Sequence, residues 1–188
     1  MPARHATGLA GAMNDMWLPD DQDPRAQAKS PRGERECLVG YLEHYRTTME
    51  LKCDGLTAEQ MASRSVPPST LSPLGMVRHM ARVEQSWFRR VIEGQTDIAR
   101  LFQDQDGGFD FDVAAVDDAF VADAWRLWRD EVAYARGVLE RTDLDALVEV
   151  HGDATEVRDI VVHMIEEYAR HCGHLDLLRE CIDGRTGQ

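Results

Sequence analysis

Hydrophobic residues recur at helical spacing in four long segments of the chain. In the first, which begins near Glu34, the apolar stripe consists of Leu38, Tyr41, Leu42, Tyr45 and Met49. The second opens at Ser72 and Pro73, an N-cap followed by proline at the first helical position, and is predicted to run to about Glu93. The third and fourth helices are predicted over about 118–141 and 155–183. No segment alternates with a period of two, so we predict no sheet.

These four helices predict an all-α protein, with a four-helix bundle as the architecture. The connection between the second and third helices covers residues 95–116, and this length permits a crossover instead of a tight hairpin. Residues 1–34 contain four prolines and no sustained period. We therefore expect a flexible N-terminal arm (1–34) before the bundle (35–188), with one short piece near Trp17 packing back onto the body.

Composition and charge narrow the possible partners. The 188 residues are 43% hydrophobic, as expected for one globular domain. The net charge of −13 argues against binding to nucleic acid or to an anionic membrane surface. No apolar run approaches the roughly 20 residues that span a bilayer, and the N-terminus makes a poor signal peptide. The four cysteines share no Cys-x-x-Cys spacing, so we expect free thiols and a cytoplasmic location.

The fourth predicted helix has polar residues at the centre of an apolar heptad pattern. The positions that step by four and three are Ile160, Met164, Glu167, His171, His174, Leu178 and Cys181. An uncompensated carboxylate among apolar neighbours costs several kcal/mol, so the environment of Glu167 must supply compensation. Two hypotheses remain open: a hydrogen-bonded network with Arg or Tyr from other helices, or a metal ion bound by Glu and His side chains one turn apart.

A further ligand for such an ion would have to come from another helix. In the second helix, His79 lies at the edge of a wide apolar face and could reach the bundle interior. A single inward histidine is more often a hydrogen-bonded core residue, and a Glu-x-x-x-His pair is common by chance. The remaining histidines, which are His5, His44, His151 and His163, are weaker candidates. The residues alone therefore leave both hypotheses open.

Two blocks of sequence carry a family resemblance. The segments VPPSTLSPLGMVRHMARVEQSWFRRV (66–91) and VVHMIEEYARHCGHLDLLRECIDG (161–184) resemble the DinB-like metalloenzyme superfamily, in the branch that includes mycothiol-dependent maleylpyruvate isomerase. The resemblance implies a four-helix bundle that holds a divalent metal, with zinc as the expected ion and nickel as the alternative. It implies His79, Glu167 and His171 as the ligands, with His174 as a polar neighbour of the ligand set.

The resemblance also implies a reaction. Mycothiol would be the thiol cosubstrate, and its metal-bound thiolate would attack a small electrophilic substrate. Maleylpyruvate isomerase has an additional C-terminal domain, whereas this chain ends at Gln188, so we do not expect maleylpyruvate as the substrate. The family is frequently dimeric, which makes a homodimer possible here.

Two other functions compete with this transferase. One is a non-catalytic stress protein that binds a metal and a hydrophobic ligand. The other is a metal-dependent hydrolase, for which Glu84 is the nearest candidate general base. Glu84 lies five residues after His79, which is a poor match to the helical repeat, so we expect it to point away from the site.

Overall fold

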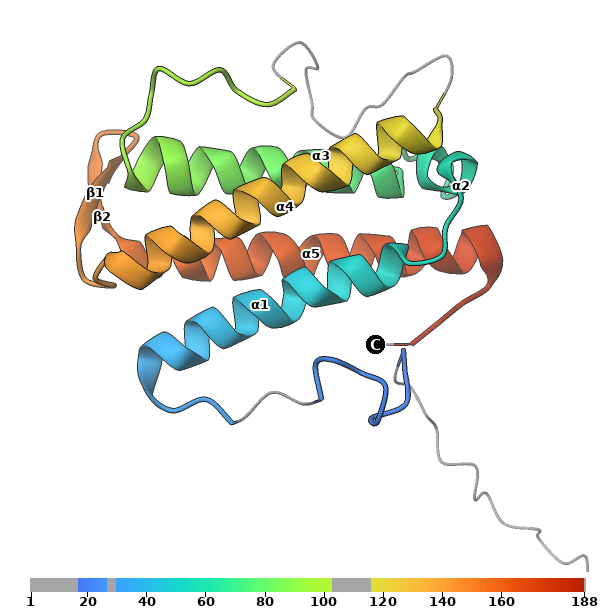
Figure 1. Cartoon of the computed structure of the whole chain (residues 1–188), viewed down its shortest axis with the longest axis horizontal. Coiled ribbons are helices and arrows are strands. Elements are labelled where there is room, and N and C mark those ends of the chain that lie inside the picture. Colours follow the sequence, from blue (N-terminus) through green and yellow to red (C-terminus); the bar gives the residue numbers. More distant parts are fainter. Residues whose placement is uncertain (1–16, 27–29, 103–115, 188) are drawn as a thin grey trace, which may run out of the picture.

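The computed structural model describes residues 17–26, 30–102 and 116–187, and its helices form a bundle (Figure 1). The long helices are α1 (Gly33–Cys53), α3 (Pro73–Glu84), α4 (Asp118–Arg141) and α5 (Val157–Asp183). The short elements are α2 (Ala58–Ala62), the π-helical η1 (Gln85–Ile92) that continues α3, and the strands β1 (Leu147–Val150) and β2 (Asp153–Glu156). The expected all-α bundle is therefore confirmed.

The four long helices pack unequally around one core. Helix α1 packs mainly against α5, and α3 packs mainly against α4 and also contacts α5. Figure 1 shows α1 running along α5, and α4 crossing α3 obliquely. The core between them is apolar at its centre, with Leu42, Met80, Phe88 and Met164 fully buried. Each helix thus buries one apolar face, as the period of its sequence predicts.

Several helix ends form where the sequence predicts them. The Ser72 hydroxyl accepts a hydrogen bond from the Gly75 amide at 3.1 Å, and Pro73 occupies the first turn of α3. The α5 helix ends at Gly184, whose φ of +78° is the left-handed conformation that glycine adopts without strain. The cap at Ser72 therefore places the start of α3 two turns before His79.

The second predicted helix differs from the structure in its second half. From Gln85 to Ile92 the backbone is π-helical, and the Glu93 amide donates to the Phe88 carbonyl five residues earlier at 3.2 Å. The wider turn keeps the Phe88 side chain in the core while Trp87 remains half-buried. A π-helical turn contains less than one residue more than an α-helical turn, so it hardly changes the spacing of the apolar residues. The apolar pattern of the sequence therefore does not distinguish the two.

The prediction that the chain has no sheet is wrong. Strands β1 and β2 pair as an antiparallel hairpin between α4 and α5. The two residues of its turn, His151 and Gly152, both have positive φ, of 54° and 93°, which matches the tight turn of a two-residue hairpin. Each strand has only four residues, so the alternation is too short to be distinguished from a loop.

Part of the N-terminal segment packs on the bundle, as expected for the piece near Trp17. The Trp17 side chain is buried, and its ring lies 4.1 Å from the Lys52 ammonium and 3.9 Å from the Arg185 guanidinium. Residues 1–16 and 27–29 of the expected flexible arm lie outside the described residues, so the division into arm and bundle stays a prediction. Within the part of the chain that the structure describes, no helix is long and apolar enough to cross a membrane.

Candidate metal centre

The three residues expected to bind a metal lie together between α3 and α5. His79 comes from the middle of α3, and Glu167 and His171 come from successive turns of α5. A Glu167 carboxylate oxygen, Oε2, lies 3.2 Å from His171 Nε2 and 3.7 Å from His79 Nε2. One potential ligand atom from each residue lies within 4.8 Å of the other two. Such an arrangement leaves room for one ion between the three groups.

The two histidines of this cluster are neutral at physiological pH. Burial is the main cause that lowers the pKa of His79 to about 4, and the nearby His171 and Arg82 lower it further, against the opposing effect of Glu167. Burial also lowers the pKa of His171, again against Glu167. Neutral imidazoles present nitrogen lone pairs, so two nitrogens and a carboxylate oxygen are available, and this donor set suits zinc or a similar divalent ion.

His174 contacts the cluster through His171. The Nδ1 atoms of the two rings lie 3.2 Å apart, so one of them donates a hydrogen bond to the other. If His171 keeps the lone pair of Nε2 for an ion, its proton is on Nδ1 and it is the donor. His174 is then the acceptor and fixes the orientation of the His171 ring, a role that matches the polar neighbour expected from the sequence.

The structure brings a third histidine close to Glu167. His163 is one of the weaker candidates by sequence, but its Nε2 lies 3.8 Å from Glu167 Oε1, and its ring packs against Trp87 at a centroid distance of 4.8 Å. The Arg170 guanidinium lies 3.5 Å from the same carboxylate oxygen. In the sequence, the position of His163 one turn before Glu167 indicates that the two side chains are neighbours. Its angle on the helix, away from the apolar face, argues against a place in the site.

The other buried acid near α3 belongs to a separate network. Glu84 is fully buried and accepts hydrogen bonds from Arg46 at 2.7 and 2.8 Å and from the Tyr168 hydroxyl at 2.6 Å. The Trp128 indole in turn donates to that hydroxyl at 2.8 Å. All four long helices contribute a residue to this network, which holds the Glu84 carboxylate within the core. Glu84 is thus unavailable as a general base, in agreement with the expectation that it points away from the site.

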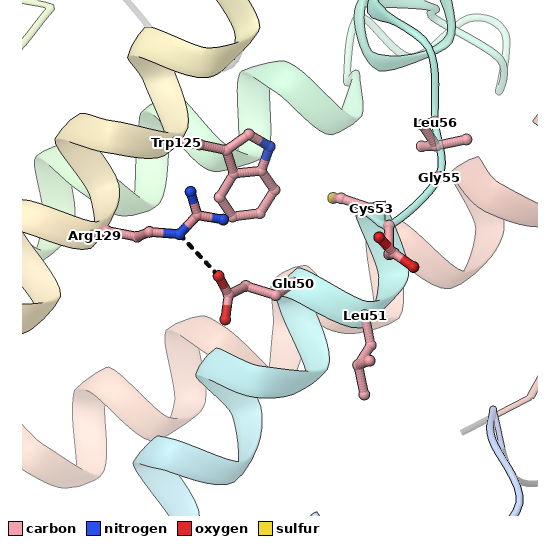
Figure 2. A pocket seen from close by; sticks show the side chains of 8 residues that line it. Glu50, Leu51, Cys53, Gly55, Leu56, Trp125 and Arg129 are labelled. Atoms are coloured by element: carbon pink, nitrogen blue, oxygen red, sulfur yellow. Dashed lines mark hydrogen bonds and ion pairs between the residues drawn. The ribbon is translucent and has the colours of Figure 1, made fainter. Parts of the chain in front are cut away.

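The cysteines lie apart from the metal-ligand cluster. Cys172 follows His171 in α5, but its sulfur contacts the Tyr45 carbonyl of α1, and burial raises the pKa of its thiol to about 12. Burial also raises the pKa of Cys53, which lies beside the pocket between α1 and α4 shown in Figure 2. This pocket has a volume of about 370 Å³ and contains none of the three candidate ligands. It is lined by Glu50, Leu51, Cys53, Asp54, Gly55, Leu56, Trp125 and Arg129.

Comparison with known protein families identifies the family of this chain. A family model described as mycothiol S-transferase matches residues 37–184. The chain belongs to the mycothiol S-transferase family. Membership places it in the DinB-like superfamily and supports mycothiol S-transferase activity and mycothiol use in general terms. The match is to this family and does not identify the maleylpyruvate isomerase branch. No curated protein sequence matches the chain.

Proposed function

We propose that this chain is a metal-dependent mycothiol S-transferase that acts on a small electrophile. The observation that carries the proposal is the convergence of His79, Glu167 and His171 from two helices, in a chain whose family is mycothiol S-transferase. Zinc is the proposed ion and nickel the alternative, because both accept two imidazoles and a carboxylate. The resemblance to the branch that includes mycothiol-dependent maleylpyruvate isomerase is part of this proposal.

The side chains of the site have distinct roles in this function. His79 and His171 offer neutral nitrogens, and Glu167 offers a negative oxygen that offsets part of the charge of an ion. His174 orients His171, and Arg170 and His163 hold the second oxygen of Glu167. A divalent ion bound by three protein ligands keeps an open position, where a thiol would lose its proton near neutral pH.

The nucleophile in this proposal is supplied by the cosubstrate. Cys172 and Cys53 are buried thiols with raised pKa values, and no cysteine joins the metal-ligand cluster of the described residues. The thiol sulfur of mycothiol forms a bond to the electrophilic carbon, and the leaving group departs with the electrons of its own bond. The thiol proton passes to solvent, so the conjugate is a thioether and no oxidant is required.

The decisive measurement is metal content together with conjugation. The protein is purified without added metal or a histidine tag, and the metal content is measured by mass spectrometry for wild type, Glu167→Ala and His171→Ala. We expect about one ion per chain in wild type and loss of metal and of mycothiol conjugation in both variants. His151→Asn, in the exposed hairpin turn, is the matched control and should keep both.

Two outcomes would contradict this function. If His171→Ala binds no metal and still conjugates at the parent rate, the reaction does not use the ion. If wild type binds no metal and the variants fold as well as wild type, the cluster is a polar core network. The non-catalytic binding protein would then be preferred, and saturable binding of a hydrophobic ligand without turnover would support it.

The remaining expectations about partners are part of the same proposal. The net charge of −13 argues against nucleic acid and membrane partners and agrees with a cytoplasmic enzyme. Residues 1–34 are proposed as the arm and 35–188 as the bundle. A homodimer is proposed from the family resemblance, and light scattering on the full chain tests it by giving the mass in solution.

A further inference from the structure

The pocket at the C-terminal end of α1 belongs neither to the metal-ligand cluster nor to the buried network around Glu84. Helices α1 and α4 diverge towards the end where the chain continues into α2 (Figure 1), and the pocket lies between them there. Its volume of about 370 Å³ falls within the range of about 300–1,000 Å³ that is typical of small-molecule sites. The last turn of α1, residues 54–56 and two side chains of α4 form its walls. The pocket is therefore large enough for a small ligand that makes no contact with the candidate metal ligands.

The Cys53 side chain points into this pocket without a hydrogen-bond partner. It is 5% exposed, and Figure 2 shows its sulfur directed towards Trp125. Within the described part of the chain, no group forms a hydrogen bond with this sulfur. Burial raises the pKa of the thiol, which therefore stays neutral and adds no charge to the pocket. A buried polar group that faces a cavity unpaired is an arrangement that a bound molecule would complete.

The wall formed by α4 already binds a cation of the protein itself. The Arg129 guanidinium lies 5.3 Å from the centre of the Trp125 ring, and its Nε donates to Glu50 at 3.1 Å (Figure 2). Trp128 packs edge-on against Trp125 at a centroid distance of 5.4 Å, which holds the indole in place. An indole face beside a carboxylate is a combination that binds organic cations.

The pocket has one negative charge in excess. Arg129 balances Glu50, whereas no cation of the described residues forms an ion pair with the Asp54 carboxylate. Both acids lie at the C-terminal end of α1, where the helix dipole is negative and favours cations. Lys52 and Arg179 lie at the same helix end but do not line the pocket. One positive charge supplied by a ligand would therefore balance the charges of the pocket.

We propose that this pocket binds a small amine with a single positive charge and an apolar or aromatic body. The ammonium group pairs with Asp54, and the body lies against Trp125 and Leu56. A single charge fits best, because a second cationic group would meet the Arg129 guanidinium. This site is separate from the metal-ligand cluster, so the inference goes beyond the proposed transferase function and does not rest on it.

The test compares 2-phenylethylammonium with 2-phenylethanol, which have similar shapes and differ in charge. Both are titrated into the ¹⁵N-labelled full chain at neutral pH and constant ionic strength, and the affinities come from NMR shifts. The indole N–H signal of Trp125, assigned with Trp125→Phe, should move. The signal of Trp87, which packs against His163 near the metal-ligand cluster, should not. We expect the ammonium to bind about 10-fold more tightly than the alcohol, as for one charge-assisted contact.

Three variants locate the charge that the ammonium recognises. Asp54→Asn should lower the affinity of the ammonium to that of the alcohol and leave the affinity of the alcohol unchanged. Asp153→Asn is the matched control, because it removes the same charge from an exposed position in the hairpin, outside the pocket, and should change neither affinity. Glu167→Ala should also leave both affinities unchanged, since Glu167 belongs to the metal-ligand cluster.

Four results would overturn the inference. The Trp125 signal could stay in place up to the solubility limit of the ammonium. The two molecules could bind equally well to wild type. Asp54→Asn could keep the preference for the ammonium, in which case this carboxylate does not select it. Glu167→Ala could abolish binding, in which case the ammonium occupies the metal-ligand cluster.

Discussion

The ion pair between Arg46 and Glu84 provides the most quantitative test of how this bundle is held together. Arg46 is 1% exposed and Glu84 is 0% exposed, and two parallel hydrogen bonds join them. Burial and the neighbouring Glu84 carboxylate raise the pKa of Tyr168, so its hydroxyl stays protonated and donates to Glu84. Removing Arg46 would therefore leave a buried carboxylate with the Tyr168 hydroxyl as its remaining donor in this network.

The expected cost of Arg46→Met follows from this geometry. Breaking a buried pair by removing one partner typically costs about 3–5 kcal/mol, because the remaining charge is uncompensated. For a chain of this size, that corresponds to a fall in melting temperature of about 6–20 °C. The double variant Arg46→Met/Glu84→Gln removes both charges and keeps an oxygen that accepts from Tyr168. We expect it to be more stable than Arg46→Met alone by about 2 kcal/mol or more.

Urea denaturation followed by circular dichroism measures the free energy of unfolding for wild type, both single variants and the double variant. Arg126→Met is the matched control, because its ion pairs with Asp123 and Asp130 are exposed, share no partner with Arg46 and should contribute at most about 1 kcal/mol. The reasoning is refuted if Arg46→Met costs less than about 1 kcal/mol. It is equally refuted if the double variant loses the sum of the two single losses, since the pair would then not be coupled.

Three further predictions follow from local features. Ser72→Ala should lower stability by about 1 kcal/mol in urea denaturation, because it removes the acceptor of the Gly75 amide at the start of α3. Trp17→Ala should lower stability by about 3 kcal/mol by the same assay, and no change would mean that this segment does not pack in solution. In the metal-free protein, the pKa values of His79 and His171 are lower in the folded than in the unfolded state. Below about pH 6.5 the unfolded state therefore binds more protons than the folded state. Stability should therefore be lost as pH falls from about 6.5 towards 4, and His79→Leu should show a weaker pH dependence.

The helices could be predicted because each has local signals that agree with its packing. The N-cap at Ser72, the glycine at Gly184 and the apolar period place α3 and α5 to within a few residues of their observed ends. The hairpin and η1 could not be predicted in the same way. Two four-residue strands contain too few positions to establish a period, and the π-helical turns of η1 depend on how Phe88 packs in the core.

The candidate site was predicted in part from a pattern and in part from resemblance. The heptad pattern of α5 singled out Glu167, His171 and His174, and the helical position of His79 made it the leading histidine outside α5. The resemblance then implied His79, Glu167 and His171 as the ligand set. The contact of His163 with Glu167 depends on side-chain direction within α5, which spacing alone does not determine.

The two glutamates near α3 differ in the partners that compensate their charge. The buried network of Arg and Tyr exists, but it surrounds Glu84, at distances of 2.6 to 2.8 Å. Around Glu167 the contacts are longer: neutral imidazoles at 3.2 and 3.7 Å and the Arg170 guanidinium at 3.5 Å. A carboxylate so placed gains more from a cation than from its present neighbours. A carboxylate in the core needs compensation of its charge. Protein groups supply this compensation at Glu84, whereas at Glu167 a bound ion would supply it.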